Sequence, residues 1–473
     1  MSQQPTAQPK SVLRGHRAQV HTTAFVRRNQ RLASGDADGF VVLWDLTIMR
    51  PRAVWRAHTN AILGISDWGD DKLITEGRDN RLIVWKITAE DEAALSIALP
   101  LDEAAPERPQ PWVVHILEIN TMNFCSFASC AARSDVASEE ELLVAVPNTL
   151  ASEAVDIYQL PSQKRQHTVH LGSKAEQKGM VMALRLFWHH HGSLVLVAGY
   201  ENGLAIVAQR RCGGSWDVVY KTQAHSQPVI SLDVAPGREY FLTSSADAVI
   251  AKHPIPNAGA PEVSVTTTET RTTEKTAGMG QESGADPSLL SAGFGSSSTP
   301  TSESYVSASA SGTRPPKKTV LPVETQPLKT VNTKHAGQQD LRIRSDGKIF
   351  ATAGWDSKVR VYSAKTMAEL AVLKWHDVGC YAVAFAALED ANNTTACGKA
   401  EEYQNAEGRG ESEEGSAAVA TTTASKGKET AMTAMSNKLG DLSVKDRRIK
   451  LAKEAHWLAA GSKDGKISLW DVY

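Results

Sequence analysis

The chain of 473 residues has few cysteines and no long hydrophobic run. Its five cysteines are odd in number and form no Cys-X-X-Cys pair, which favours a reducing compartment over a disulfide framework. No apolar stretch reaches the length that spans a bilayer, and the first ten residues, MSQQPTAQPK, lack the apolar segment of a secretion signal. We therefore expect a soluble intracellular protein without a membrane segment.

The chain also lacks an excess of charge of one sign. Its 51 lysines and arginines nearly balance its 53 aspartates and glutamates, so the net charge is −2 at pH 7. Proteins that bind nucleic acid or an anionic membrane through their overall electrostatic field carry a clear positive excess. We therefore expect no direct binding to nucleic acid and no binding to membranes.

What the chain does contain is a repeated pattern. In the first copy, Gly15-His16 precedes two short apolar runs, 32–34 and 40–44, which flank a turn at Asp38-Gly39 and predict a β-hairpin. Seven copies occur, two of them weak, at a spacing of roughly 44 residues once segments without strand character are removed, which is near the period of four-stranded blades. The sequence predicts an all-β fold, a seven-bladed WD-repeat β-propeller over residues 11–473.

The repeats also predict where the blades lie and how the ring closes. Residues 11–14 precede the first repeat at the place where the fourth strand of a blade belongs, so we expect this N-terminal strand to complete the last blade and close the ring. The predicted blades cover about residues 15–47, 52–87, 112–160, 166–209, 216–255, 327–364 and 370–473, the last together with 11–14.

Two long low-complexity insertions interrupt the repeats, at residues 257–326 and 389–450. Their Ser-, Thr-, Gly- and Ala-rich composition cannot bury enough apolar surface to become ordered, although residues 445–453 have helical composition. If the strands of a blade are named a to d from the channel outward, both insertions and the shorter ones at 88–111 and 129–140 fall in a–b or c–d connections. We therefore expect all four on one face, with short loops on the other.

WD repeats contain a His, a Ser or Thr, an Asp and a Trp that form one buried hydrogen-bonded chain, and their spacing recurs here. The predicted members are His16, Ser34, Asp38 and Trp44; His58, Thr75, Asp79 and Trp85; His225, Thr243 and Asp247; His335, Thr352, Asp356 and Tyr362; and His376, Asp464 and Trp470, where Ala460 stands in the hydroxyl position. A His, a Ser and an Asp also make a hydrolase triad, but recurrence in several blades favours the structural role. We predict no catalytic residue, metal ligand or cofactor.

Binding is expected to use loop side chains that the blades hold in place. The b–c turns of the short-loop face supply six candidates for partner binding, which are Arg78, Asn80, Tyr200, Glu201, Trp355 and Lys463.

Several motifs in combination resemble a known fungal family. They include Gly35–Gly39, Trp55–His58, Ala351–Asp356 and His456–Asp471. Together these stretches are similar to the ASTRA-associated protein 1 family over nearly the whole ring, outside the two insertions. The resemblance implies a non-catalytic WD-repeat subunit of the ASTRA assembly, linked to chromatin remodelling and, with Tel2-Tti1-Tti2-type partners, to maturation of phosphatidylinositol-3-kinase-related kinases. It also implies the nucleus, with the cytoplasm as a second compartment.

Other function classes remain as alternatives at this stage. A WD-repeat substrate receptor of a cullin-type ubiquitin ligase usually carries Trp-Asp-X-Arg at the end of a repeat, whereas this chain has Trp44-Asp45-Leu46-Thr47 and Trp85-Lys86-Ile87-Thr88. A propeller hydrolase would need unpaired acidic or His residues around the channel. A role like that of a G-protein β subunit would need an N-terminal coiled coil, and only about ten polar residues precede the first strand.

Overall fold

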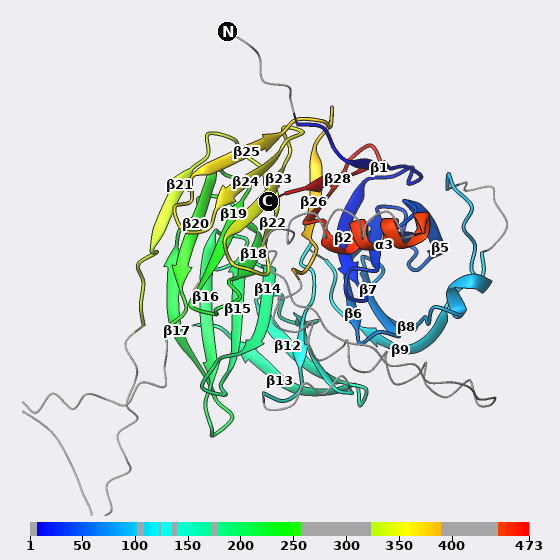
Figure 1. The fold of residues 1–473 in the computed structure, drawn as a ribbon. Coiled ribbons are helices and arrows are strands. Elements are labelled where there is room, and N and C mark those ends of the chain that lie inside the picture. Colours follow the sequence, from blue (N-terminus) through cyan, green and yellow to red (C-terminus); the bar gives the residue numbers. More distant parts are fainter. Residues whose placement is uncertain are drawn as a thin grey trace, which may run out of the picture. The chain divides into compact units, whose positions relative to one another are not determined.

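In a computed structural model, the described residues are 7–101, 108–122, 124–134, 140–172, 177–256, 323–388 and 443–472. All belong to one compact unit, made of Met1–Ala258 and Pro322–Tyr473. This unit contains seven four-stranded antiparallel sheets around a central channel (Figure 1). The predicted seven-bladed β-propeller is therefore confirmed.

Six of the sheets are continuous in sequence. The first two contain β2 (Val20–Val26), β3 (Arg31–Asp36), β4 (Phe40–Asp45) and β5 (Arg50–Arg56), then β6 (Ile62–Trp68), β7 (Lys72–Gly77), β8 (Arg81–Lys86) and β9 (Trp112–Glu118). The next two contain β10 (Ala128–Ala131), β11 (Leu142–Pro147), β12 (Ala154–Leu160) and β13 (Lys164–His170), then β14 (Val181–Trp188), β15 (Leu194–Tyr200), β16 (Leu204–Arg210) and β17 (Trp216–Gln223). The fifth and sixth contain β18 (Val229–Val234), β19 (Tyr240–Ser245), β20 (Val249–Pro254) and β21 (Lys329–Asn332), then β22 (Gln338–Ile343), β23 (Ile349–Gly354), β24 (Val359–Ser363) and β25 (Glu369–Leu373).

The seventh sheet joins the two ends of the chain, as predicted. Its first three strands are β26 (Cys380–Phe385), β27 (Trp457–Ser462) and β28 (Ile467–Asp471), and the outer strand is the N-terminal β1 (Ser11–Leu13). Strand β1 pairs antiparallel with β28, from Ser11 opposite Leu469 to Leu13 opposite Ile467. Hydrogen bonds between the first and last strands of the chain therefore close the ring.

The predicted blade bounds differ from the sheets by one strand. The blades predicted to begin at about residues 52, 112, 166, 216, 327 and 370 start with β5, β9, β13, β17, β21 and β25, each of which is the outer strand of the preceding sheet. The physical reason is that an outer strand pairs with the strand c just before it in sequence, as Phe40 of β4 pairs with Arg56 of β5. The sequence repeat therefore runs d-a-b-c, whereas the hydrogen-bonded sheet runs a-b-c-d.

The core lies between the sheets, because the blades pack face to face. Strand β15 shows this most clearly, since all seven of its residues are buried. Its sequence is accordingly a continuous apolar run instead of an alternation of apolar and polar residues. The largest fully buried side chains include Trp44, Trp55 and Trp85, and the last two rings pack edge to face at 6.0 Å between blades one and two.

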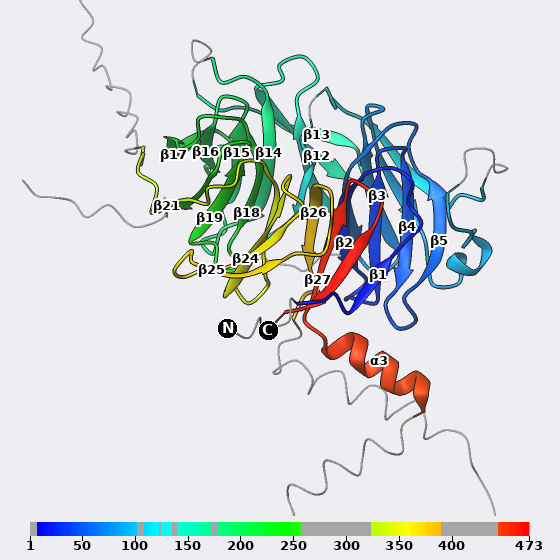
Figure 2. The same ribbon diagram turned by 90° about the horizontal axis from the view of Figure 1, so that it is seen from above.

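The long connections leave from one face of the ring. They join β8 to β9 and β20 to β21, which are c–d connections, and β10 to β11 and β26 to β27, which are a–b connections. Helix α3 (Val444–Glu454) lies on this side in Figure 2, and Ser443 caps it by accepting a hydrogen bond from the Asp446 N–H. Neither α3 nor the short 3-10 helix η1 (Asp91–Ala94), the helices of the described residues, is long and apolar enough to cross a membrane.

Most of the two predicted low-complexity insertions, residues 257–322 and 389–442, lies outside the described residues. Near the C-terminal end of the first insertion, Glu324 forms a parallel β-bridge with Tyr220 of the outer strand β17. The predicted insertion at 257–326 therefore extends too far at its C-terminal end. In the second, α3 contains the whole of the predicted helical stretch 445–453, which is therefore confirmed.

Residues 91–101 form a strap across the outer edge of the first blade. The Ser96 carbonyl accepts a hydrogen bond from the Val54 N–H of strand β5, and the Leu101 N–H donates to the Gly15 carbonyl. Glu92 anchors the strap, since its fully buried carboxylate contacts the guanidinium groups of Arg27, Arg31 and Arg52. An outer strand that would otherwise expose unpaired backbone groups is thereby covered.

Candidate interaction surface

The second blade contains the whole expected hydrogen-bonded chain. The Trp85 Nε1–H donates to Thr75 Oγ1 at 2.8 Å, Thr75 Oγ1 lies 2.8 Å from His58 Nε2, and His58 Nδ1 lies 2.9 Å from Asp79 Oδ1. Burial alone would raise the pKa of Asp79, but hydrogen bonds from His58 and the Thr59 N–H lower it overall. The chain ties the d–a loop to strands b and c, so it fixes the loops of the short-loop face.

Loss of the central hydroxyl in this chain gives a measurable prediction. We expect Thr75→Val to lower the free energy of unfolding by about 2–4 kcal/mol, because Trp85 Nε1 and His58 Nε2 both lose their partner in a dry site. Urea unfolding of the purified protein measures this. Thr352→Val is the matched control, since among the described residues the Thr352 hydroxyl forms one hydrogen bond, to Gln338 Oε1, and its loss should cost about half as much. Equal effects of the two variants would contradict the role given to Thr75.

The first blade uses a different carboxylate from the one predicted. His16 Nδ1 lies 2.6 Å from Asp36 Oδ2, and His16 Nε2 and the Trp44 Nε1–H both reach Ser34 Oγ. Asp36 is buried and also accepts the N–H groups of Asp38 and Phe40. Asp38 is therefore wrong as the fourth member. The reason is that blade one has Asp36 at the end of strand b, where blade two has Gly77. The carboxylate that contacts the histidine therefore lies two residues before the predicted Asp38.

The fifth blade has a fourth member that the sequence reading missed. Thr243 Oγ1 lies 2.7 Å from His225 Nε2 and 2.8 Å from His253 Nε2, and His225 Nδ1 lies 3.2 Å from Asp247. His253 stands ten residues after the threonine, the spacing at which Trp85 follows Thr75, so the signal was present. Its Nδ1 lies 2.9 Å from the hydroxyl of Tyr220, and burial lowers the pKa of His253 to about 3, which keeps the ring neutral.

The sixth blade departs from the prediction at its histidine. The Thr352 hydroxyl donates to Gln338 Oε1 at 2.7 Å, whereas His335 is exposed and its Nδ1 lies 3.7 Å from Asp356, which pairs mainly with Arg360. The loop from the histidine to the first residue of strand a is one residue shorter here than in blade two. His335 is therefore wrong as the partner of Thr352, and Gln338 takes its place. Tyr362 is buried beside Phe350.

The seventh blade has its hydroxyl on a different strand. His376 Nε2 and the Trp470 Nε1–H both reach Ser468 Oγ at 2.8 Å. Ser468 lies directly opposite Ala460 in the β27–β28 pairing, so the hydroxyl comes from strand c instead of strand b. Asp464 pairs with Lys466, and His376 Nδ1 has no hydrogen-bond partner within the described residues, so Asp464 is wrong as a member of this chain.

The mouth of the channel on the short-loop face is built from β-bulges. In six of the seven sheets the pairing of strand a with strand b shifts at the second residue of strand a. A bulge leaves one residue unpaired and re-aims its side chain. The six unpaired residues, which we call the mouth ring, all line one small cavity of about 80 Å³ and are His21, Leu63, Met182, Ile230, Gln339 and Tyr381.

Two of the predicted partner-binding residues contact this mouth. The Arg78 guanidinium lies 4.4 Å from the centre of the Phe124 ring, and Phe124 lines the same cavity as the mouth ring. Trp355 is 48% exposed, and its Nε1–H donates to Gln339 Oε1 at 2.8 Å. Arg78 and Trp355 therefore lie on the same surface as the mouth ring.

The other predicted residues divide into exposed and buried ones. Asn80, Glu201 and Lys463 are exposed on b–c turns, as expected. Asn80 is fixed by Thr121, whose hydroxyl donates to its Oδ1 at 2.9 Å. Tyr200 is fully buried, and its hydroxyl donates to the Glu153 carbonyl, so it is wrong as a contact residue. Tyr200 is the last residue of strand β15, which packs between two blades.

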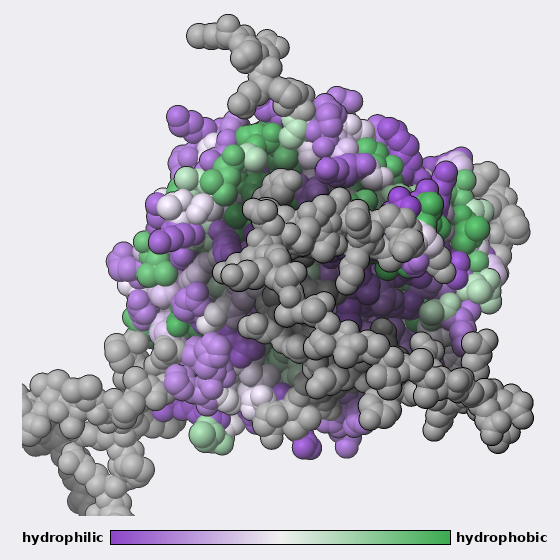
Figure 3. Space-filling view, in the orientation of Figure 1, coloured by the Kyte–Doolittle hydropathy of each residue, from purple (hydrophilic) through white to green (hydrophobic). Residues whose placement is uncertain are grey.

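The face also exposes large apolar residues that the sequence reading did not select. Met122 and Phe124, in the d–a loop before β10, are 77% and 51% exposed, and Leu150, in the b–c loop after β11, is 96% exposed. Blade three has no His-Ser-Asp-Trp pattern, so its loops could not be placed by spacing. By contrast, the described surface around α3 is mostly hydrophilic, with smaller apolar areas (Figure 3).

A buried carboxyl group holds the d–a loop that carries Phe124. Glu76 of strand β7 is fully buried, and its Oε2 accepts a hydrogen bond from the Phe127 N–H at 2.6 Å. Its other oxygen has no hydrogen-bond partner in the part of the chain that the structure describes. Burial raises the pKa of Glu76 to about 8, and the Phe127 N–H lowers it only in part. Glu76 is therefore mainly protonated at neutral pH.

No metal centre is found among the described residues, where no group of three His, Cys, Asp or Glu side chains is placed to hold an ion. The residue types of the hydrolase triad are buried, since Ser34 and Asp36 have no exposed surface. A buried serine cannot reach a substrate, and this arrangement gives no support to a hydrolase.

Comparisons with known proteins agree on one family. The profile described as ASTRA-associated protein 1 matches residues 9–470. The protein of that name from Pyricularia oryzae is 51% identical and covers 99% of this chain and 97% of its own length. Those from Verticillium alfalfae and Schizosaccharomyces pombe are 48% and 32% identical and cover 99% and 80% of this chain and 93% of their own lengths.

Among solved structures, the β-propeller domain of Cps50 (Swd1) from Myceliophteria thermophila superposes with a TM-score of 0.54. The two chains are 12% identical, and the match covers 98% of this chain and 99% of the other. This likeness concerns the propeller fold alone.

Proposed function

Because the chain belongs to the ASTRA-associated protein 1 family, we propose that it is a non-catalytic WD-repeat scaffold subunit of the ASTRA complex. In this role it mediates protein–protein interactions in chromatin remodelling and in the maturation of phosphatidylinositol-3-kinase-related kinases. Its partners are protein subunits of that assembly, including those of the Tel2-Tti1-Tti2 type, and it works in the nucleus and also in the cytoplasm.

The observation that carries the proposal is the exposed apolar surface around the channel mouth. Phe124 and Trp355 are both held in place, because Glu76 accepts the Phe127 N–H of the loop that carries Phe124 and Gln339 accepts the Trp355 Nε1–H. Large exposed aromatic side chains on a rigid surface are typical of protein–protein contacts, where Trp, Tyr and Arg contribute most of the binding energy. Arg78, stacked on Phe124, and Tyr381 of the mouth ring add the same residue types.

Mutation of this surface tests the proposal. We expect the double variant Phe124→Ala, Trp355→Ala to retain its melting temperature but to recover at least about tenfold less of the Tel2-Tti1-Tti2-type subunits in affinity purification, because two aromatic anchors are lost. Trp112→Ala is the matched control, since Trp112 is 76% exposed on the outer strand β9, at the rim of the ring. Equal recovery with the double variant, or an equal loss with Trp112→Ala, would contradict the assignment to this face.

A further inference from the structure

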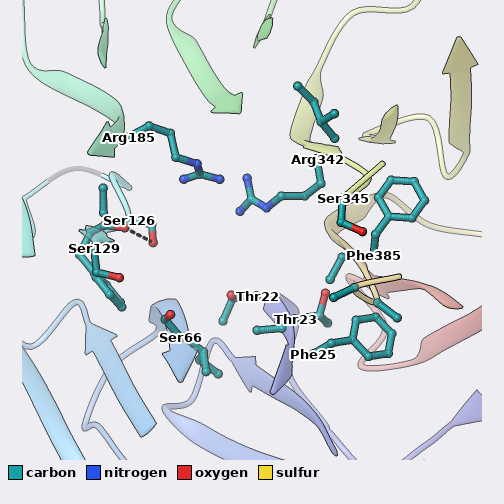
Figure 4. A pocket seen from close by; sticks show the side chains of 18 residues that line it. Thr22, Thr23, Phe25, Ser66, Ser126, Ser129, Arg185, Arg342, Ser345 and Phe385 are labelled. Atoms are coloured by element: carbon teal, nitrogen blue, oxygen red, sulfur yellow. Dashed lines mark hydrogen bonds between the residues drawn. The ribbon is translucent and has the colours of Figure 1, made fainter. Parts of the chain in front are cut away.

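The channel widens beyond the mouth ring into a second cavity of about 410 Å³. It is lined by strand a residues of six blades, and we call it the channel cavity (Figure 4). Its size falls within the range of small-molecule sites, roughly 300–1,000 Å³. Of the residues that line it, only Arg185 and Arg342 carry a charge, and none is an aspartate or glutamate.

The two arginines face each other across this cavity, as Figure 4 shows. Arg185 of β14 donates from Nε to Asp233 Oδ1 at 3.0 Å. Arg342 of β22 forms an ion pair with Asp340, with 3.0 Å between Nη1 and Oδ1. Each aspartate is itself fixed, because Asp233 accepts the Ile343 N–H and Asp340 accepts the Val383 N–H. The guanidinium groups are therefore held in place before any ligand arrives.

Both guanidinium groups keep unused donors. Arg185 also donates from Nη1 to the Leu184 carbonyl, and Arg342 from Nη1 to the Leu341 carbonyl. Within the described residues, the Nη2 atom of each arginine has no hydrogen-bond partner. An anion between the two guanidinium groups would accept these free N–H groups, in charge-assisted hydrogen bonds from two forks that are already held in place.

Hydroxyl groups complete the lining. Six residues contribute them, from four blades, and they are Thr22, Thr23, Ser66, Ser126, Ser129 and Ser345. Paired guanidinium forks together with Ser and Thr hydroxyls make the donor set that phosphate groups prefer in proteins. The volume exceeds what a single phosphate group needs, so there is room for an organic moiety.

We propose that the channel cavity binds a small molecule with a phosphate group, which lies between Arg185 and Arg342. The phosphate oxygens accept the free N–H groups of both arginines, and the hydroxyl groups contact the rest of the ligand. This site adjoins the small cavity of the mouth ring, since Arg185 and Arg342 line both cavities, but Phe124 and Trp355 of the exposed apolar surface do not line it. Failure of the partner-binding proposal would leave it unaffected, and the reverse also holds.

Titration calorimetry of the purified full chain tests the site, with inorganic phosphate and glycerol 3-phosphate as probes. We expect binding of both, with a higher affinity for the ester if an organic phosphate is the natural ligand and for inorganic phosphate if the free ion is. Arg342→Lys keeps the charge that pairs with Asp340 but loses the planar fork, and we expect it to weaken binding about tenfold or more.

The matched control is Arg211→Gln, which removes a partly exposed arginine paired with Asp217 on another hairpin. We expect it to bind both probes as the wild type does. Thermal melting of each variant verifies that the ring is folded. No heat of binding for either probe at millimolar concentration, equal affinity in Arg342→Lys and the wild type, or an equal loss in Arg211→Gln would overturn the proposal.

Discussion

Replacing Glu92 by alanine is expected to lower the free energy of unfolding by about 3–5 kcal/mol, because the largely buried guanidinium groups of Arg27 and Arg31 lose their nearest carboxylate. The Glu92 carboxylate is fully buried and contacts Arg27, Arg31 and Arg52, at 3.0 Å for Arg31 Nη2 and 3.2 Å for Arg52 Nε. The loss should also release the strap, so the Val54 amide, which donates to Ser96, should exchange its proton faster. Urea unfolding and hydrogen exchange measure the two effects.

The control for Glu92 is an ion pair on the surface of the same two blades. Arg28 and Asp70 lie 3.6 Å apart, and their side chains are 74% and 65% exposed. Asp70→Ala should change the stability by less than about 1 kcal/mol, because water screens the pair. A similar small effect for Glu92→Ala would show that the strap is not held by this carboxylate.

Glu76 makes the stability of the ring depend on pH in an unusual direction. Its pKa is about 8 in the folded protein against 4.5 for an ordinary glutamate, so the unfolded chain releases this proton near pH 4.5 while the folded protein retains it. Glu76 therefore contributes stability that is fully present below about pH 4.5, is lost as the pH rises, and is gone above about pH 8. The difference across this range amounts to about 5 kcal/mol.

We expect Glu76→Gln to remove this dependence, because the amide stays neutral at every pH and its oxygen can still accept the Phe127 N–H. The variant should be more stable than the wild type at pH 8.5 and similar to it at pH 5. Urea unfolding at several pH values measures the slope. Glu118→Gln, at an exposed carboxyl group of the same blade, is the matched control. If Glu76→Gln keeps the wild-type slope, the burial of an uncompensated carboxyl group is not its cause.

The fold was predictable from the sequence because its determinants repeat. Each copy carries its own turn and apolar runs, and the unpaired strand at 11–14 indicated how the ring closes. The sequence did not show which strand begins each sheet, because a repeat of four strands has the same length whichever strand is taken as the first. The strap was missed because Glu92 is held by three arginines that are 40 to 65 residues away in sequence.

The hydrogen-bonded chains and the candidate surface were predictable only where each residue lies at its usual position in the repeat. Spacing located the chain of His58 and Asp79, but it failed where the hydroxyl moved to the opposite strand at Ser468 or where a loop lost a residue before Gln338. Arg78 and Trp355 were found because they lie on short b–c turns. Phe124 and the mouth ring were missed, since a bulge depends on the register between two strands and leaves no motif.

Affinity purification tests most directly whether this propeller is a scaffold subunit of the ASTRA complex. The tagged full chain is expressed in its own cells, purified at moderate salt, and the proteins that co-purify are quantified by mass spectrometry. If the chain has this role, we expect Tel2-Tti1-Tti2-type subunits to co-purify together with phosphatidylinositol-3-kinase-related kinases. Recovery of a cullin adaptor in their place, or of neither, would contradict it.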